Sequence, residues 1–413
     1  MEKSKEQQIY EKVFAPVAMD FACWVTDEAV KRGVKRLYFL ARDGYQSFLA
    51  ADFMVKKRGL PLDCRYLEGS RYAWRLPEYA LLEEEKILDR ICIGGIDVTL
   101  RKILRRGGLT EEEAEKTASS AGLKEILDRK LSYSETRQMA KRLSGNPLLI
   151  SYIKEHSERA YESVIGYFRQ EGLFEDINFA VADSGWTGSV QQTLSRLLDS
   201  ARPGAGREVE GYYFGLYELP AEADPKKYHV FFFRPYKDTG KKSRFSNCLF
   251  EAVFSEERGQ TVGYERKEGR FSPVRETEFN PNRDRIAANV SCLREQLRTW
   301  DYRGTDTKLH MKRLLRLMSH PEEDEAEIMG SYLFSDDVWG SSLQKVARDL
   351  TEAEIKTHHP LKRLMLMKGG RGVFKDSAWI EGSIVKNGRN TGRHLFNARL
   401  YKKLIYLRKK RKS

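Results

Sequence analysis

The 413-residue sequence lacks the cysteine and histidine patterns of disulfide-rich and zinc-binding proteins. Its five cysteines are scattered without CxxC spacing, and their odd number does not suit a disulfide framework, so we expect reduced, structural thiols. None of the seven histidines has HExxH or similar ligand spacing, and we interpret the His358-His359 pair as a polar surface dipeptide. The sequence therefore predicts no tightly bound zinc and no set of metal-ligating side chains.

Long apolar runs are also missing. No stretch approaches the roughly 20 apolar residues that a membrane-spanning helix needs. The first residues, MEKSKEQQIYEKVF, lack the apolar core of a secretory signal. These absences predict a cytoplasmic protein. Hydrophobic residues still make up 40% of the chain and aromatic residues 11%, so we expect a folded protein with room for two or three domains.

Acidic residues are missing from the last part of the chain. Residues 382–413 contain eleven Lys or Arg and no Asp or Glu, so subtracting these charges from the net charge of +13 leaves +2 for the remainder. The Leu, Ile and Tyr residues interspersed among basic residues from Lys402 to Lys412 predict a helix that contacts an anionic membrane surface at the inner membrane face. A nucleic-acid patch and a solubilising tail are the alternatives. A nearly neutral body without an RNA- or DNA-binding motif disfavours nucleic acid.

What the sequence does contain is a repeated succession of apolar strand, short polar loop and amphipathic helix. Such units form parallel sheets, because the helical crossover returns each strand in the same direction. The predicted fold class is α/β, with a Rossmann-like parallel sheet. The expected strands are residues 36–41, 63–67, 177–182, 210–216 and 229–234, and the expected helices around them are 11–31, 45–57, 148–170 and 189–198.

The same pattern divides the chain into four parts. We predict an α/β core made of residues 1–81 and 147–235, and a charged helical insertion at 82–146. A mixed, mostly helical C-terminal region follows at 236–381, and residues 382–413 form the basic tail. Within the C-terminal region, residues 261–275 alternate like a hairpin.

The first candidate site is the segment FAVADSGWTGSV, residues 179–190. An apolar strand stops at Asp183, and glycines and hydroxyls follow where a helix is expected to begin. A helix N-terminus exposes unpaired N–H groups and can hold an anion. The expected phosphate- or ligand-binding residues are Ser184, Gly185, Trp186, Thr187, Gly188 and Ser189. The alternative is an ordinary N-cap by Thr187 or Ser189 with no ligand.

Two earlier strand ends have a similar composition. LYFLARDGY ends with Arg42, Asp43 and Gly44, and the next strand is followed by Ser70 and Arg71. Guanidinium groups bind phosphate, and a carboxylate can orient a hydroxyl or a metal ion. The alternative is an Arg–Asp pair that only braces the loops. Because ligands of open parallel sheets bind at the carboxyl ends of the strands, we expect the three loops to converge.

Three acidic residues are candidates for catalysis: Asp183, Asp43 and Glu251. Glu251 lies in the apolar helical run NCLFEAVFSE, where it either faces solvent, as most such acids do, or turns to the site as a general base. Trp186 is expected to pack on the neighbouring layer, with stacking on a base or sugar as the alternative. No cofactor is certain from the sequence, and Mg²⁺ bound together with a phosphate group is the candidate.

The phrases YFLARDGY, YLEGSRYAWRLP and VADSGWTGSVQQTL resemble, in this order, the C-terminal part of a bacterial family described as predicted haloacid dehalogenase (HAD)-superfamily hydrolases. That family is found with surface-polysaccharide biosynthesis. The resemblance covers most of residues 10–260 in arrangement and is specific in those phrases. Family members often carry a separate hydrolase domain with a DxDxT-type nucleophile motif, which this sequence does not contain. The phosphatase chemistry of the family name is therefore not carried over.

The segment VADSGWTGS is also similar to the ribose-phosphate loop of phosphoribosyltransferases, in which an apolar strand ends in acids followed by a Thr-Gly turn. Asp183, Thr187 and Gly188 match, whereas Ala182 stands where the first of two acids is usual. The resemblances imply an enzyme of bacterial surface-glycan assembly that binds a phosphorylated or nucleotide-linked sugar and transfers a glycosyl or phosphoribosyl group. The alternatives are a non-catalytic scaffold that docks glycosyltransferases or other biosynthetic enzymes at the membrane, and a partner of a HAD-family hydrolase.

Overall fold

A five-stranded parallel sheet organises the molecule. The computed structural model describes residues 3–203, 209–302, 305–335, 343–368 and 374–410. The strands of the sheet lie in the order β2-β1-β3-β4-β5 and all run parallel. They are β1 (Arg36–Leu40), β2 (Asp63–Leu67), β3 (Phe179–Trp186), β4 (Glu210–Leu216) and β5 (Tyr228–Phe233). The predicted α/β class with a Rossmann-like parallel sheet is confirmed.

The strand order reverses at β1. This strand pairs with β2 on one side and with β3 on the other, so Arg36 lies opposite both Asp63 and Phe179. At such a reversal point the loops after the two central strands turn toward opposite faces of the sheet and leave a crevice outside the carboxyl ends. The topology therefore places the most favourable position for a ligand beyond the ends of β1 and β3.

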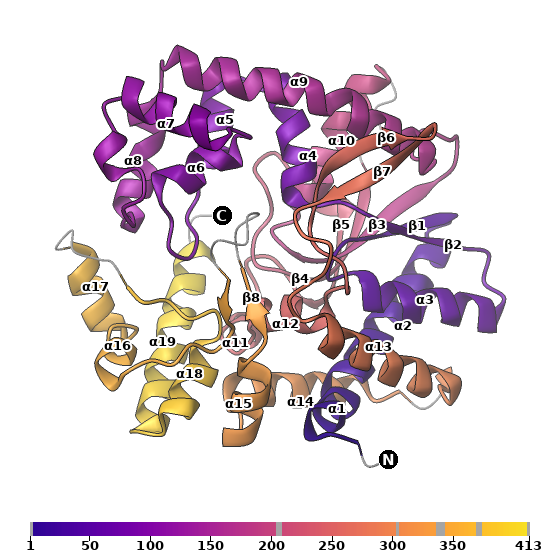
Figure 1. Cartoon of the computed structure of the whole chain (residues 1–413). Helices are drawn as coiled ribbons and strands as arrows, with labels where there is room; N and C mark the ends of the chain where they lie inside the picture. The colour runs from indigo at the N-terminus through magenta and orange to yellow at the C-terminus, as the bar shows by residue number, and fades with distance from the viewer. Residues whose placement is uncertain (1–2, 204–208, 303–304, 336–342, 369–373, 411–413) are drawn as a thin grey trace.

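Helices cover both faces of the sheet (Figure 1). Alternate residues of each strand point to opposite sides, so Leu37 and Phe39 pack into one core and Tyr38 and Leu40 into the other. The first face is covered by α2 (Ala15–Lys31), α3 (Tyr45–Arg58), α12 (Asn247–Phe254), α13 (Arg283–Arg298) and α14 (Thr307–Ser319). The second face is covered by α4 (Arg71–Glu78), α9 (Pro147–Gln170) and α10 (Ser189–Ala201). Because both faces are buried, the central strands are almost continuously apolar.

A helical insertion lies between α4 and α9. Its helices are α5 (Glu84–Ile91), α6 (Leu100–Arg106), α7 (Glu111–Ser120) and α8 (Tyr133–Leu143). They share a hydrophobic core that also includes Leu149 and Ile153 from the first turns of α9. The insertion therefore rests on α9 and has a core separate from that of the sheet.

The C-terminal region is mostly helical and carries the expected hairpin, β6 (Thr261–Lys267) and β7 (Arg270–Arg275). Its other elements are α11 (Thr239–Lys242), α15 (Glu323–Gly330), β8 (Leu333–Phe334), β9 (Gln344–Lys345), α16 (Glu352–Lys356), α17 (Pro360–Lys368), α18 (Ile380–Asn387) and α19 (Thr391–Lys410). At the other end of the chain, α1 (Lys5–Ile9) leads through a π-helical turn into α2. Within the described residues, no helix combines the length and apolarity that a membrane crossing requires.

The basic residues near the C-terminus lie on helices, as the sequence predicts. Helix α19 spans Thr391–Lys410, and Lys402 Nζ forms an ion pair of 2.7 Å with Glu381 of α18. Arg411 and Lys412 lie outside the described residues. One expectation needs correction, because the two neighbouring histidines are not a surface dipeptide. His358 is buried, and Nε2 of His359 lies 2.8 Å from Nδ1 of His394.

Candidate functional site

A cavity of about 740 Å³ opens at the carboxyl ends of β1, β2 and β3. Ten of the residues singled out in the sequence line its wall, which shows that the three strand-end loops meet. These residues are Arg42, Asp43, Ser70, Arg71, Asp183, Gly185, Trp186, Thr187, Ser189 and Glu251. The helical insertion adds Asp89, Arg90 and Ile93 to the wall, and α12 adds Asn247 and Cys248. The cavity therefore combines the sheet edge with side chains from both flanking regions.

Three other residues singled out in the sequence lie behind the wall and shape it. Gly44 precedes α3, and a side chain there would collide with the carbonyl oxygen of Leu40. Gly188 caps α10 in the left-handed conformation, with φ of 64°, and packs closely on the ring of Tyr228. Ser184 is buried in β3, where its side chain hydrogen-bonds to Asp43. These residues position the loops and do not contact the cavity.

The predicted course of the chain after Asp183 is wrong in one respect. The strand does not end there, since β3 continues to Trp186 and stays in register with β4, with Gly185 opposite Gly215 and Trp186 opposite Leu216. Helix α10 begins only at Ser189, so Ser184, Gly185 and Trp186 are strand residues and not part of a helix start. Thr187, Gly188 and Ser189 alone form the turn into the helix, and Thr187 Oγ1 donates to Ser189 Oγ at 3.2 Å.

Three carboxyl groups face one another in the cavity. Burial, and then repulsion from Asp43, raises the pKa of Asp183 well above its ordinary value. Burial also raises the pKa of Asp43, whereas the hydrogen bond from Ser184 lowers it. Burial and the charge of Asp43 raise the pKa of Glu251 to about 7, although Arg71 opposes this. Like charges at close range oppose one another's ionisation, and Glu251, with its pKa of about 7, is the member of the group suited to donate or accept a proton near neutral pH.

Glu251 is turned toward the site, unlike most acids in apolar helices. Helix α12 packs its Leu249, Phe250, Val253 and Phe254 into the main core, which leaves Glu251 on the side that faces the carboxyl end of β3. The indole Nε1 of Trp186 donates a hydrogen bond to Glu251. The helix thus presents its one acid to the cavity.

Trp186 packs as the sequence predicts. Its ring is 6% exposed and lies among the rings of Tyr217, Phe233, Phe245 and Phe250, with centroids 5.2–6.2 Å apart. Its φ of 73° is unusual for a residue with a side chain. The aromatic cluster and the hydrogen bond to Glu251 hold it there.

Two arginines of the cavity were missed in the sequence. Arg75 follows Arg71 by four residues on α4, so both lie on the same side of the helix and line the cavity. Arg75 Nη2 donates to Ser189 Oγ at 2.9 Å, and its Nε has no hydrogen-bond partner among the described residues. Burial, together with the charge of Arg71, lowers the pKa of Arg75 to about 10. The i,i+4 repeat of arginine at a helix start is the signal that could have identified it.

Arg90, the second missed arginine, reaches the cavity from the insertion. It forms an ion pair with the fully buried Glu78, which also accepts from Thr193 at 2.8 Å and from Arg196 at 2.8 Å. This network joins α4, α5 and α10, so the basic wall of the cavity is built on three helices. Nothing in the local sequence around Arg90 indicates this long-range contact.

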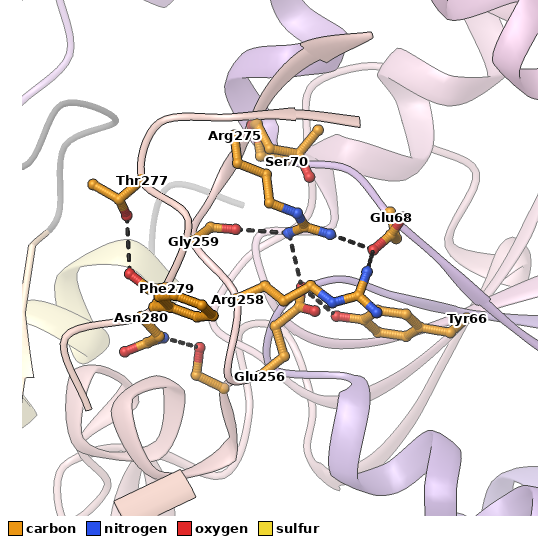
Figure 2. Close-up of polar contacts among 12 residues, drawn as sticks. Tyr66, Glu68, Ser70, Glu256, Arg258, Gly259, Arg275, Thr277, Phe279 and Asn280 are labelled. Carbon is orange, nitrogen blue, oxygen red and sulfur yellow. Dashed lines mark hydrogen bonds and ion pairs between the residues drawn. The ribbon is translucent and has the colours of Figure 1, made fainter. Parts of the chain in front are cut away.

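Polar contacts tie the hairpin region to the end of β2 (Figure 2). Glu68 forms ion pairs with Arg275 and, at 2.8 Å, with Arg258, while Tyr66 donates to Glu256 at 2.8 Å. Ser70 Oγ donates to the carbonyl oxygen of Thr261 at 2.7 Å. The loop that carries Ser70 and Arg71 is therefore held in place by the hairpin from the other side.

Replacing Arg275 by methionine should lower the free energy of unfolding by about 2 kcal/mol, because it leaves the carboxylates of Glu68 and Glu256 short of a buried partner. The matched control is Arg258→Met, since Arg258 pairs with the same oxygen of Glu68 but its side chain is 62% exposed. That change should cost less than about 0.5 kcal/mol. Urea unfolding of both variants measures the difference, and equal costs would contradict the assigned role of the buried pair.

The side chains around the cavity can also be compared with those of known kinds of metal site. Among the described residues, no group of three or more His, Cys, Asp or Glu side chains is placed to hold a metal ion. The five cysteines are free thiols, and Cys248 is the one among them that lines the cavity. A metal ion at this site would therefore need ligands from a substrate as well as from the carboxylates.

Comparisons with known proteins add no identification. No protein-family model matches the chain, and no curated protein matches it significantly.

Proposed function

We propose that the cavity binds a phosphorylated or nucleotide-linked sugar and that the protein transfers a glycosyl or phosphoribosyl group in bacterial surface-polysaccharide biosynthesis. One observation carries the proposal: the arginines and the three carboxyl groups gather in a single cavity at the strand ends. Arginines recognise phosphate oxygens, and carboxyl groups recognise sugar hydroxyls. A sugar phosphate presents both kinds of group within one small molecule.

The proposed roles follow from the positions of the side chains. Arg42, Arg71 and Arg75 would hold the phosphate, with the turn at Thr187 and Ser189 donating further hydrogen bonds. Asp43 and Asp183 would orient a sugar hydroxyl. Glu251, whose pKa of about 7 lets it exist in both protonation states near neutral pH, would be the general acid or base.

Mg²⁺ is compatible with this arrangement only as part of the substrate complex. Phosphate oxygens and one or two carboxylates are its usual protein-site ligands, and Asp43 and Asp183 are the candidates here. The ion would neutralise phosphate charge, and it would offset the repulsion between these two carboxyl groups.

The surface-polysaccharide assignment is an extension of the resemblance of the phrases around Arg42, Ser70 and Asp183 to the HAD-associated family. The absence of a DxDxT motif argues against a phosphatase reaction for this chain. A non-catalytic scaffold would bind the same ligand without converting it. Incubation of the protein with the sugar donor that it binds, followed by detection of any product, distinguishes a transferase from a non-catalytic scaffold.

Arg71→Ala should weaken the binding of a phosphorylated sugar about tenfold, because a charge-assisted hydrogen bond to phosphate is lost. Isothermal titration would be done with sugar phosphates, nucleotide sugars and phosphoribosyl pyrophosphate, each with and without Mg²⁺. Arg159→Ala is the matched control, since Arg159 is 69% exposed on α9 and does not line the cavity. Absence of binding to every ligand, or equal weakening by both changes, would contradict the proposal.

A further inference from the structure

Exposed apolar side chains gather on two helices of the C-terminal region. Seven of the fifteen large hydrophobic residues that are exposed within the described chain belong to α17 and α19. They are Leu361, Leu364, Met365, Phe396, Leu400, Leu404 and Leu407, and we call these seven residues the docking face. Single exposed apolar residues are ordinary, but a cluster of this kind marks a surface that contacts something apolar.

On α19 the exposed residues form one continuous stripe. Phe396, Leu400, Leu404 and Leu407 follow one another at spacings of three and four residues, which places them along one side of a helix. The opposite side is packed against the body, where Leu395 and Ala398 are buried and Tyr406 stacks on Tyr217 at 5.2 Å. The helix is therefore anchored by one side, and its apolar stripe has no covering element among the described residues.

Helix α17 carries the other three residues of the docking face and lies beside α19. Leu361 is 75% exposed and Met365 71% exposed, and the guanidinium of Arg363 lies over the ring of Tyr401 at 5.2 Å, which joins α17 to α19. Leu361, Leu364 and Leu404 line a common groove of about 780 Å³. The far wall of the groove includes Tyr133, Thr136 and Arg137 of α8 in the insertion, and Tyr133 is exposed. Figure 1 shows the helices of the insertion across from α17 and α19.

The charged residues around the docking face are mainly basic. Lys362 on α17 and Arg393 and Arg408 on α19 are exposed beside the apolar stripe, and Arg137 is exposed on the far wall of the groove. Residues 391–410 contain no acidic residue. A face that combines leucines with arginines complements a surface that has an apolar interior and an anionic boundary.

We propose that the docking face binds the surface of an anionic lipid bilayer, with the apolar stripe inserted between the headgroups and the flanking cations paired with lipid phosphates. The exposed leucines argue against nucleic acid as the binding partner, since a phosphate backbone offers no apolar layer in which they could be buried. This proposal differs from a basic tail, because it assigns the contact to two packed helices. Lys402 is already paired with Glu381 and contributes little. The inference does not depend on the chemistry of the cavity.

The test is flotation of the full chain with vesicles. Vesicles of phosphatidylcholine with phosphatidylglycerol in equal parts should bind the protein at low salt. Vesicles of phosphatidylcholine alone should bind it at least about tenfold less, because the flanking cations then have no net anionic surface to attract them. Added salt should release the protein, since it screens this attraction. No flotation with the anionic vesicles at low salt would overturn the proposal.

A double change, Leu361→Ser with Met365→Ser, should lower the bound fraction about tenfold or more, because two apolar side chains no longer enter the bilayer. Leu148→Ser with Leu309→Ser is the matched control, since these residues are 39% and 37% exposed on α9 and α14 and lie outside the docking face. Thermal melts should show both variants folded. Equal flotation of the two variants would overturn the proposal. So would tight binding to double-stranded DNA that the docking-face change leaves unaltered.

Discussion

A Glu251→Gln variant should be more stable than the wild-type protein at about pH 8, by about 2–3 kcal/mol in the free energy of unfolding. The gain should disappear as the pH falls to about 4.5. Burial and the neighbouring charge of Asp43 raise the pKa of Glu251 from 4.5 to about 7 in the folded protein. Glutamine has nearly the same shape and can still accept the hydrogen bond from Trp186.

The sign of this effect follows from proton binding. Between about pH 4.5 and 7, Glu251 keeps its proton in the folded state, whereas the same residue loses it in the unfolded state. The folded state therefore binds more protons in this window, and the free energy of unfolding falls as the pH rises through it. Above about pH 7 the full cost of an ionised, buried carboxylate is present. Glutamine carries no such cost at any pH.

Urea unfolding at a series of pH values measures the difference between the two proteins. Glu158→Gln is the control, because Glu158 is exposed on α9 and its replacement should change the free energy of unfolding by less than about 0.5 kcal/mol throughout. A Glu251→Gln variant that is less stable than the wild type at about pH 8 would show that the carboxylate contributes favourable contacts instead. A gain would support a functional role, since sites that perform chemistry often retain groups that reduce stability.

The sheet could be predicted from the sequence because its signal is local. Strands β1, β3, β4 and β5 contain short apolar runs, and β2 was indicated by the break at Pro61 before it and the polar loop after it. The alternation of residues 261–275 predicted the hairpin. The meeting of Arg42, Arg71 and Asp183 in one cavity was also predictable, because parallel strands that are neighbours end at the same edge.

The end of β3 and the basic wall of the cavity could not be predicted in the same way. Polar and glycine residues after Asp183 are typical of a loop, but β4 extends beside them and offers backbone partners as far as Leu216. The position of Arg90 depends on the buried Glu78 twelve residues away and on α10 far along the chain. Such contacts are set by packing between distant segments, for which a single sequence carries no periodic signal.

Trp186→Ala should lower the free energy of unfolding by about 3–5 kcal/mol, which is the largest loss we expect from one substitution in this site. The indole is buried among four aromatic rings, so its removal leaves a cavity that rigid neighbours cannot fill. It also removes the hydrogen bond to Glu251 and leaves that carboxyl group more exposed to repulsion from Asp43.

Trp186→Phe separates the two contributions of the indole. Phenylalanine fills most of the space but cannot donate to Glu251, so this variant should lose about 1–2 kcal/mol. Tyr302→Ala is the control for loss of an aromatic ring, since Tyr302 is 49% exposed, and it should change stability little. Guanidinium unfolding gives all three values.

If Trp186 served instead to stack on a ligand, Trp186→Ala would cost little stability and would mainly weaken the binding of nucleotide sugars. The packed geometry therefore predicts that Trp186→Phe keeps its affinity for the sugar phosphate within about threefold of the wild type, because a packing residue acts on the ligand only through the wall it supports.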